Sequence, residues 1–222
     1  MERSRHFWRD IETDPERLRH DVSVAINAER NLYSGAPTTI APWLDALHLR
    51  EGDRVFHVGC GTGYYTAVMA ETVGASGHVI AVEIDPAIAA RARENLAYLN
   101  FVEVITGDGA AIDPPESDAI LIHAGVTHPR SVWLDRLRPE GRLLLPLTFE
   151  IGMPHVGKGA PFKIQRHGDS YEARLSSGPI MLYSCAGARD AEMNERLLQA
   201  FETGGMDQVR SLRRDHHEPA ES

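Results

Sequence analysis

One stretch constrains the fold of this chain more than any other: a predicted strand that turns through glycines into a predicted helix. The strand is the β-branched run Arg54–Val58, and the helix covers residues 64–71, where apolar side chains recur at helical spacing. Between them lie three glycines, Gly59, Gly61 and Gly63. A turn of this kind brings bare backbone N–H groups and the positive end of a helix to one point. It therefore predicts a seat for an anionic group of a ligand.

The spacing of these glycines separates two classes of ligand. A dinucleotide-binding turn has the pattern Gly-x-Gly-x-x-Gly, in which the last glycine would fall on Tyr64. The chain has Gly63 one residue earlier, and its pattern Gly-x-Gly-x-Gly resembles motif I of class I S-adenosylmethionine-dependent methyltransferases. The resemblance implies that the loop wraps the methionine end of that cofactor. Cys60 is interpreted as a small residue of the loop, and Tyr64 as a packing residue, with a cover over the cofactor as its alternative role. A nicotinamide-dependent dehydrogenase is the alternative that such a fold also allows.

Predicted strands and helices alternate along the rest of the central region. Strands are expected over residues 77–83, 101–106, 118–123 and 142–147, and helices over 85–99 and 130–137. This alternation is typical of an α/β fold with a doubly wound, Rossmann-like and mostly parallel sheet. Residues 161–175 are divided by a Gly-Asp turn, which predicts an antiparallel C-terminal hairpin, and a further strand is expected over 178–184.

The expected organisation has three parts. Residues 1–50 form an N-terminal helical region, with one or two added helices between residues 10 and 32 and a short helix over 40–49. Residues 51–187 form the cofactor-binding core. Residues 188–222 hold an amphipathic helix and then a polar tail, which is expected to be mobile from Thr203 onward.

Two acidic residues stand at the predicted carboxyl ends of strands, where open α/β sheets bind ligands. Glu83 follows the glycine loop by about 20 residues, the spacing at which an acid accepts both ribose hydroxyls of a nucleotide. Asp108 ends the next strand, and its carboxylate is placed to accept from an adenine amino group. The alternatives are an exposed strand-end acid for Glu83 and a turn-forming aspartate for Asp108.

The order of several motifs resembles that of protein-L-isoaspartate O-methyltransferases. The stretches that carry the resemblance are residues 53–64, 79–83, 91–96, 106–109 and 137–146. The likeness begins near Asn31 and extends to about Gly187, including the late hairpin. It implies a doubly wound sheet, S-adenosylmethionine as cofactor, and methyl transfer to a carboxylate of an altered aspartyl residue.

The acceptor side departs from the family pattern. The family carries an Ile-Ser-x-Pro element whose serine lies at the methyl-transfer site; counted back without gaps from Gly52, it falls on Gly35, one residue after Ser34. Ser34 is therefore the first candidate catalytic residue. His57 replaces an acid that is usual in the family, and either hydrogen-bonds near the amino acid end of the cofactor or is a satisfied core histidine. His123 ends a predicted strand beside the expected acceptor, as a candidate general base or as a merely polar strand end.

Together these features predict a methyltransferase that uses S-adenosyl-L-methionine. The expected cofactor contacts are His57, Gly59, Cys60, Gly61, Gly63, Tyr64, Glu83, Ile84, Asp108 and Gly109. The expected reaction is O-methylation of a carboxylate on a protein or peptide. The alternatives are a methyltransferase for a small molecule or modified peptide and a non-catalytic cofactor-binding protein.

Composition excludes other classes of function. The formal net charge of -9 disfavours a nucleic-acid partner, and no apolar run approaches the roughly 20 residues that span a membrane. The two cysteines, Cys60 and Cys185, are typical of a cytoplasmic protein with reduced thiols. No group of His, Cys and Asp residues has the spacing of metal ligands, so no metal is expected. The identity of the acceptor and the oligomeric state are not specified by these patterns.

Overall fold

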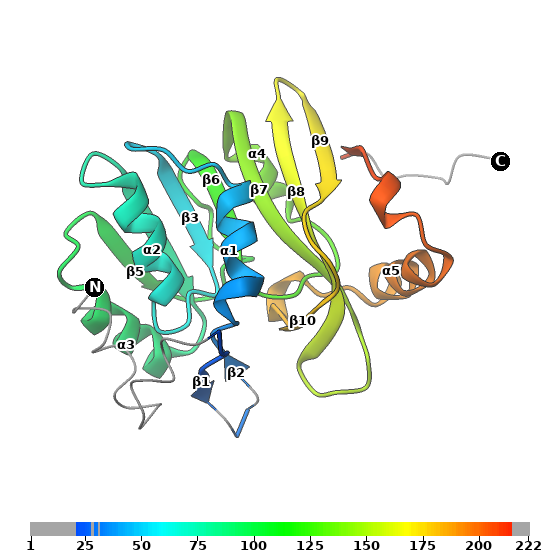
Figure 1. The fold of residues 1–222 in the computed structure, drawn as a ribbon, viewed down its shortest axis with the longest axis horizontal. Helices are drawn as coiled ribbons and strands as arrows, with labels where there is room; N and C mark the ends of the chain where they lie inside the picture. The colour runs from blue at the N-terminus through cyan, green and yellow to red at the C-terminus, as the bar shows by residue number, and fades with distance from the viewer. Residues whose placement is uncertain (1–20, 28, 31, 215–222) are drawn as a thin grey trace.

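A mixed sheet of nine strands forms the centre of the protein (Figure 1). The computed structural model describes residues 21–214 except 28 and 31. The strands of this sheet are β3 (Arg54–Val58), β4 (His78–Glu83), β5 (Val102–Thr106), β6 (Ser117–Ile122), β7 (Leu137–Glu150), β8 (Val156–His167), β9 (Ser170–Leu175), β10 (Ile180–Tyr183) and β11 (Ser211–Leu212). Their order is β11-β9-β8-β7-β6-β3-β4-β5, and β10 pairs with β8 beside the end of β9.

The half of the sheet from β5 to β7 is parallel, as the sequence predicts. β3 lies at its centre, with Phe56 paired to Ile80 of β4 on one side and to Ile120 of β6 on the other. The chain runs outward from β3 through β4 and β5, then returns to place β6 and β7 on the opposite side. This reversal at the carboxyl ends of β3 and β6 is the position where open α/β sheets form a ligand crevice.

Helices cover both faces of the parallel half. α1 (Pro37–Ala46), α2 (Tyr64–Val73) and α3 (Pro86–Leu96) pack on one face, and the short α4 (Ser131–Asp135) packs on the other. Alternate residues of β3 divide between the two cores: Val55 joins the cluster under α1 and α2, whereas Phe56 joins the cluster under α4. The predicted doubly wound architecture is thereby confirmed.

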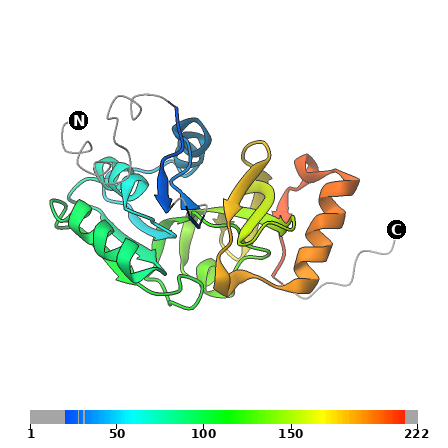
Figure 2. The ribbon, with the colours of Figure 1, turned by 90° about the horizontal axis from the view of Figure 1, so that it is seen from below.

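The antiparallel half extends the sheet from β7 through β8 to β9, confirming the predicted hairpin. β7 is longer than the strand predicted over 142–147, because it already begins at Leu137 and its pairing with β6 continues through a register shift. α5 (Ala191–Thr203) packs beside β7, and Figure 2 shows it at the end of the molecule opposite α3.

The predicted N-terminal helices over residues 10–32 are wrong for the part that the structure describes, and residues 10–20 lie outside it. β1 (Ala25–Asn27) pairs antiparallel with β2 (Leu32–Tyr33) instead. The physical reason is the alternation of Val22, Val24 and Ile26 with polar or small residues, which has the period of a strand. The helix expected over 40–49 begins earlier, at Pro37, because that proline takes its first turn; Pro42 lies inside the helix.

The described part of the tail that was expected to be mobile from Thr203 onward contains regular structure. After α5 the chain forms the 3₁₀ turn η4 (Met206–Gln208) and then β11, which pairs with Tyr171 and Glu172 of β9. Val209 and Leu212 pack against the core cluster that contains Tyr171. Burial of these apolar side chains at the sheet edge orders a segment whose composition is mostly polar.

Candidate active site

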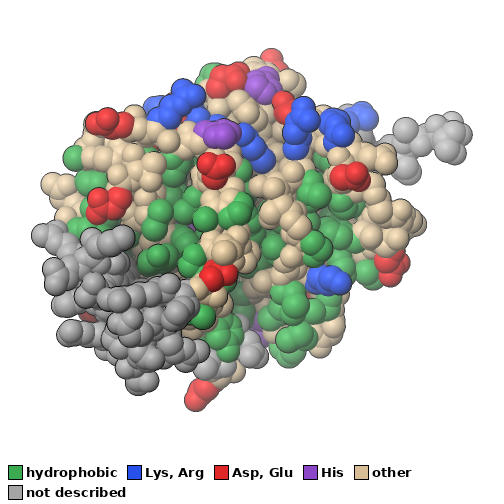
Figure 3. Space-filling model, in the orientation of Figure 1, with side chains coloured by type: hydrophobic (Ala, Val, Ile, Leu, Met, Phe, Trp, Pro, Cys, Tyr) green, Lys and Arg blue, Asp and Glu red, His purple; other side chains and the backbone are tan. Residues whose placement is uncertain are grey.

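A cavity of about 430 Å³ lies at the carboxyl ends of the parallel strands. Its floor comes from the loops after β3, β4, β5 and β6, and its walls from the β1–β2 hairpin, β10 and the 3₁₀ turn η3 (Ala186–Ala188). Tyr33, which lines the cavity, is an exposed apolar side chain. In Figure 3 hydrophobic side chains lie across the middle and lower parts of the face in view, whereas most Lys and Arg side chains lie along its upper edge.

The glycine loop adopts the backbone that its sequence requires. All three glycines have positive φ, and a Cβ on Gly61 would lie 2.7 Å from Ile26 Cδ1, while one on Gly63 would lie 2.8 Å from Leu96 Cδ1. A side chain at these positions is excluded by neighbouring apolar atoms and by backbone strain. Gly63 is the N-cap of α2 and does not line the cavity, whereas Gly59, Cys60, Gly61 and Tyr64 do.

Only part of this loop has the bare N–H groups that the sequence predicts. The N–H groups of Gly59 and Cys60 donate to Val82 O at 2.8 and 3.0 Å, and that of Gly61 donates to Glu83 Oε2 at 2.9 Å. These bonds hold the loop in place against β4. Among the described residues, the Thr62 N–H has no acceptor and the buried Thr62 Oγ1 has no partner. The unsatisfied donors thus lie just before α2 rather than along the whole loop.

Glu83 ends β4 on the cavity floor and is 7% exposed. Its Oε2 accepts from Gly61 N and its Oε1 from Asp85 N at 3.1 Å, so the carboxylate ties the glycine loop to the start of α3. Burial raises the pKa of Glu83, and these backbone donors partly offset the rise. Each oxygen retains a lone pair that a ligand hydroxyl can donate to. Ile84, the next residue, lines the same end of the cavity.

Asp108 follows β5 and lies next to two glycines, Gly109 of its own loop and Gly187 of η3. Its Oδ1 accepts from Ala110 N at 2.9 Å, and a Cβ on Gly187 of η3 would overlap its Oδ2. Gly109 is equally confined, because a Cβ there would lie 2.5 Å from Val58 Cγ1. Asp108 and Gly109 both line the cavity, so the two predicted acids, Glu83 and Asp108, belong to the same site.

His123, directly after β6, forms the part of the cavity between the glycine loop and α1. Aromatic rings surround it: Tyr65 at 5.4 Å, His57 at 5.8 Å and Trp43 at 6.0 Å between centroids. Burial lowers the pKa of His123 to about 4, so the imidazole is neutral at pH 7. No described residue hydrogen-bonds to its ring. A Cβ on Gly35 would lie 3.5 Å from His123 Nε2, which places this ring beside the N-terminal segment.

Ser34 also lines the cavity, although it is only 8% exposed. Its Oγ accepts from Val24 N at 3.3 Å and donates a long hydrogen bond to Gly35 O at 3.4 Å. The neighbouring Gly35 has a φ of 77°, and a Cβ there would lie 3.0 Å from Ile40 Cγ1. Position 35 therefore excludes a side chain, and the hydroxyl that reaches the cavity in this segment belongs to Ser34.

His57 does not line the cavity. It is fully buried behind His123, where its Nδ1 bonds Thr66 Oγ1 at 2.9 Å and its Nε2 has no partner among the described residues. Burial and the neighbouring His123 lower the pKa of His57, so it is a neutral core histidine. Of the two interpretations that the sequence left open, the geometry matches the core histidine, with one nitrogen satisfied.

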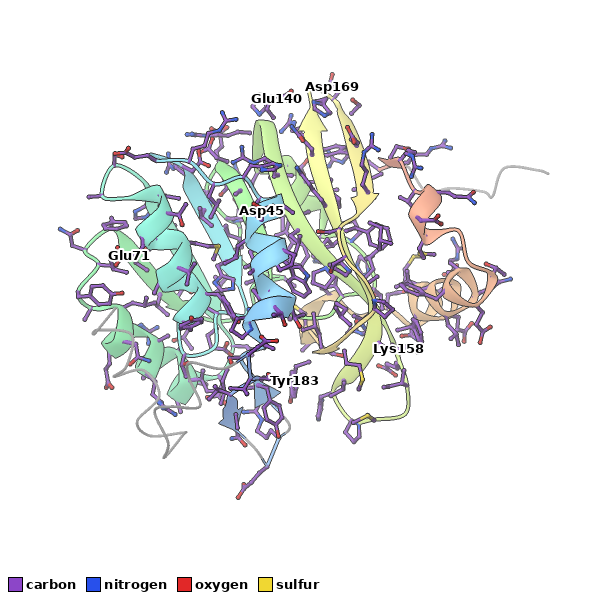
Figure 4. The ribbon with its side chains drawn as sticks, viewed as in Figure 1. Asp45, Glu71, Glu140, Lys158, Asp169 and Tyr183 are labelled. Carbon is purple, nitrogen blue, oxygen red and sulfur yellow. The ribbon has the colours of Figure 1, made fainter. Side chains whose placement is uncertain are left out.

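Several residues of the cavity wall were not predicted. Arg30 of the hairpin pairs with Asp85 at 2.5 Å and lies 6.0 Å above the ring of Tyr183, which stacks on His155 at 5.6 Å. Figure 4 places Tyr183 between β10 and the hairpin. Arg189 enters the wall just before α5. These residues come from elements that only the tertiary fold brings to the site, and no local pattern marks them.

The described residues lack two further features. They contain no group of three or more His, Cys, Asp or Glu side chains placed to hold a metal ion. No helix of this part of the chain is both long enough and apolar enough to cross a membrane.

Comparison with known proteins identifies a protein family that this chain matches. The model of the family described as protein-L-isoaspartate(D-aspartate) O-methyltransferase matches residues 15–157, so the likeness begins earlier and ends sooner than the predicted span of 31–187. The protein-L-isoaspartate O-methyltransferase of Ignicoccus hospitalis is 39% identical over 146 residues, covering 62% of this chain and 68% of that one. For protein-L-isoaspartate O-methyltransferase 2 of Archaeoglobus fulgidus the identity is 42% over 116 residues, covering 50% and 53%. The chain thus spans about half to two thirds of the length of these relatives.

Solved structures agree on the fold. One protein-L-isoaspartate O-methyltransferase superimposes with a TM-score of 0.70 at 23% identity, covering 79% of this chain and 56% of that one. A Plasmodium falciparum protein described as a protein-L-isoaspartate O-methyltransferase, solved with S-adenosyl-L-homocysteine, gives 0.63 at 19% identity, covering 81% and 85%. The family match extends over more than half of the chain, and the glycine loop and both strand-end acids fall within it. The chain therefore belongs to the protein-L-isoaspartate(D-aspartate) O-methyltransferase family of class I S-adenosylmethionine-dependent methyltransferases.

Proposed function

We propose that this chain transfers a methyl group from S-adenosyl-L-methionine to the carboxylate of an isoaspartyl residue in a protein or peptide. The observation that carries the proposal is the convergence of the glycine loop, Glu83 and Asp108 on a cavity that also contains Ser34 and His123. Family membership supplies the reaction class, and the relative from Plasmodium falciparum was solved with the product form of the same cofactor.

The residues present fit the cofactor. Glu83 is placed to accept the ribose hydroxyls and Asp108 the adenine amino group, with Ile84 and Gly109 against the nucleoside. The unsatisfied Thr62 donors at the start of α2 suit the carboxylate of the methionine end. A cavity of about 430 Å³ holds a ligand of this size. When bound, the cofactor supplies an electrophilic methyl group on a sulfonium sulfur; a carboxylate oxygen bonds to the methyl carbon in line with the carbon–sulfur bond, whose electron pair returns to the sulfur.

The side chains on the acceptor side orient the acceptor carboxylate and do not need to activate it. A carboxylate with an ordinary pKa near 4 is already ionised at pH 7, so no base has to remove a proton. Ser34 Oγ–H and the neutral imidazole N–H of His123 are the donors available to it, and both lie on the cavity wall. The aromatic rings of Trp43 and Tyr65 around His123 keep water from this end. Positioning of the carboxylate at the methyl group is the main contribution of these side chains.

The test is methyl transfer to a defined peptide pair. Purified protein with labelled cofactor is given an isoaspartyl peptide and its normal aspartyl isomer, and base-labile methyl ester is counted. We expect ester on the isoaspartyl peptide alone, a loss of turnover in Ser34→Ala and His123→Gln, and unchanged binding of S-adenosyl-L-homocysteine in both variants. Protein that binds the cofactor product yet forms no ester on either peptide would remove isoaspartate as the acceptor.

A further inference from the structure

Arg189 is a cation on the cavity wall that the proposed mechanism does not use. It precedes α5 and lies beyond residue 157, where the family match ends. Three hydrogen bonds fix its guanidinium: Nη1 donates to Thr148 O at 2.8 Å and to Thr148 Oγ1 at 2.9 Å, and Nη2 donates to Asn194 Oδ1 at 2.9 Å. Asn194 Oδ1 also accepts from the backbone N–H of Glu150. A side chain held in this way is preorganised in one orientation.

The positive charge of Arg189 has no carboxylate in contact with it. Among the described residues it forms no ion pair, and its buried Nε has no partner. Glu150 lines the same cavity and lies near enough to favour the charge, but it forms no ion pair with Arg189 and is exposed to solvent. The side chain of Asp190 caps α5 by accepting from Met193 N. The guanidinium also has more N–H donors than its three bonds use. A half-buried cation that is rigidly held and unpaired is a site for an anion, because burial penalises the unpaired charge.

The order of strands shows which ligand would reach this cation. Across the carboxyl edge of the sheet the groups run from Glu83 on β4, through the glycine loop after β3 and His123 after β6, to Arg189, which is anchored on Thr148 of β7. Neighbouring strands lie about 4.8 Å apart, so the anchor on β7 is about 10 Å from β3. By strand order the anchor of Arg189 lies one strand beyond His123, whereas Gly187, two residues before Arg189, packs on Asp108. Arg189 lines the same cavity as both His123 and Asp108.

We propose that Arg189 binds a carboxylate of the methyl acceptor and so makes the enzyme selective for anionic acceptors. The inference rests on the proposed function, because it needs an acceptor in the same cavity. Two sources supply such a carboxylate: the methyl-accepting group itself, or a second one such as the free C-terminus of a short peptide. The guanidinium recognises either by charge-assisted hydrogen bonds.

The experiment compares three variants against two probes. The probes are an acetylated isoaspartyl hexapeptide with an amidated C-terminus, so that its only anion is the isoaspartyl carboxylate, and the same peptide with a free C-terminus. The variants are Arg189→Gln, Arg189→Lys and, as a matched control on α5, Arg196→Gln, which breaks only the exposed pair with Glu192. Peptide affinity is measured by calorimetry on protein saturated with S-adenosyl-L-homocysteine, and KM and kcat are measured by ester formation.

We expect Arg189→Gln to weaken peptide binding and raise KM about 10- to 100-fold, the loss expected for a charge-assisted hydrogen bond. Affinity for S-adenosyl-L-homocysteine should stay within about twofold, Arg189→Lys should recover part of the loss, and Arg196→Gln should behave as wild type. An equal loss for both probes identifies the methyl-accepting carboxylate, and a loss for the free-terminus peptide alone identifies the second one.

Three results separate this inference from the proposed function. Wild-type turnover with unchanged peptide affinity in Arg189→Gln overturns the role of Arg189 and leaves the function standing. Peptide binding that depends on Arg189 without ester formation supports the carboxylate site and overturns the function. Loss of S-adenosyl-L-homocysteine affinity in Arg189→Gln, or absence of any peptide binding by the wild type, overturns the inference.

Discussion

Neutralising Glu83 is the sharpest test of how this cavity holds its cofactor. Glu83→Gln keeps the length of the side chain and one carbonyl oxygen, but it removes the charge and turns the other oxygen into an N–H donor. In the wild type the two carboxylate oxygens accept from Gly61 N at 2.9 Å and from Asp85 N at 3.1 Å. In Glu83→Gln the side-chain NH₂ group replaces one of these oxygens, so one of the two backbone N–H groups loses its acceptor. The substitution thus disturbs the glycine loop and the proposed ribose contacts together.

The size of the effect follows from these bonds. A hydrogen bond to a charged group contributes about 1.5–3 kcal/mol and one between neutral groups about 0.5–1.5 kcal/mol, a difference of about 1 kcal/mol for each bond. Two ribose hydroxyls give about 2 kcal/mol, or about a 30-fold rise in the Kd of S-adenosyl-L-homocysteine. Stability without ligand should change less, because removal of a buried charge offsets part of the lost loop bond.

Calorimetry with S-adenosyl-L-homocysteine measures this Kd, and Glu103→Gln is the matched control. Glu103 is exposed on the neighbouring strand β5 and does not line the cavity. Because burial raises the pKa of Glu83 and donated hydroxyls favour its ionised form, wild-type affinity should also fall as pH is lowered through that pKa, whereas Glu83→Gln should lack this dependence. If Glu83→Gln bound the ligand within about twofold of both wild type and Glu103→Gln, the ribose assignment would be refuted.

Three further outcomes test the fold around the site. Gly63→Ala should destabilise the protein by about 2–4 kcal/mol in urea unfolding, since a Cβ meets Leu96 at 2.8 Å, whereas Gly152→Ala, also at positive φ but in open space, should cost only the backbone strain of about 1–2 kcal/mol. Because burial lowers the pKa of His123 to about 4, this residue takes up a proton in the unfolded chain at a higher pH than in the folded protein. The free energy of unfolding of the wild type should therefore fall by about 2 kcal/mol more than that of His123→Gln between pH 7 and pH 5. Equal falls in the two proteins would contradict the burial of His123. Asp85→Ala removes the cap of α3 and should lower unfolding free energy by about 1–2 kcal/mol, measured at low and high salt to separate the exposed pair with Arg30.

The cofactor half of the site could be predicted because its signals are local. Gly59, Gly61 and Gly63 occupy positions where backbone torsion and neighbouring atoms exclude a side chain, and that requirement is visible in the sequence. Asp85 caps α3 by accepting from the N–H groups of Ala87 and Ile88, as its place before a proline predicts. The strand pattern, the glycine turn and the helix cap together predict where β4 ends, and hence where Glu83 lies.

The rest of the cavity wall could not be predicted in the same way. Arg189, Tyr183 and Arg30 reach the cavity through contacts between residues far apart in the chain. β11 has two residues, too few to show a period, and it exists because the partly buried Leu212 packs against the cluster that contains Tyr171. The N-terminal hairpin is a different case, since its alternating apolar residues were readable as a strand.

The two halves of the cavity are joined at one point of close approach. η3 packs so tightly on Asp108 that only a glycine fits at Gly187, and Arg189 follows two residues later along the same segment. The position of the cation on the acceptor side is therefore set partly by the residue assigned to adenine. A bound nucleoside that holds Asp108 in place would also steady η3, and with it the guanidinium. Cofactor binding should thus favour capture of an anionic acceptor, and acceptor binding should favour the cofactor equally, because the same short turn supports both sites.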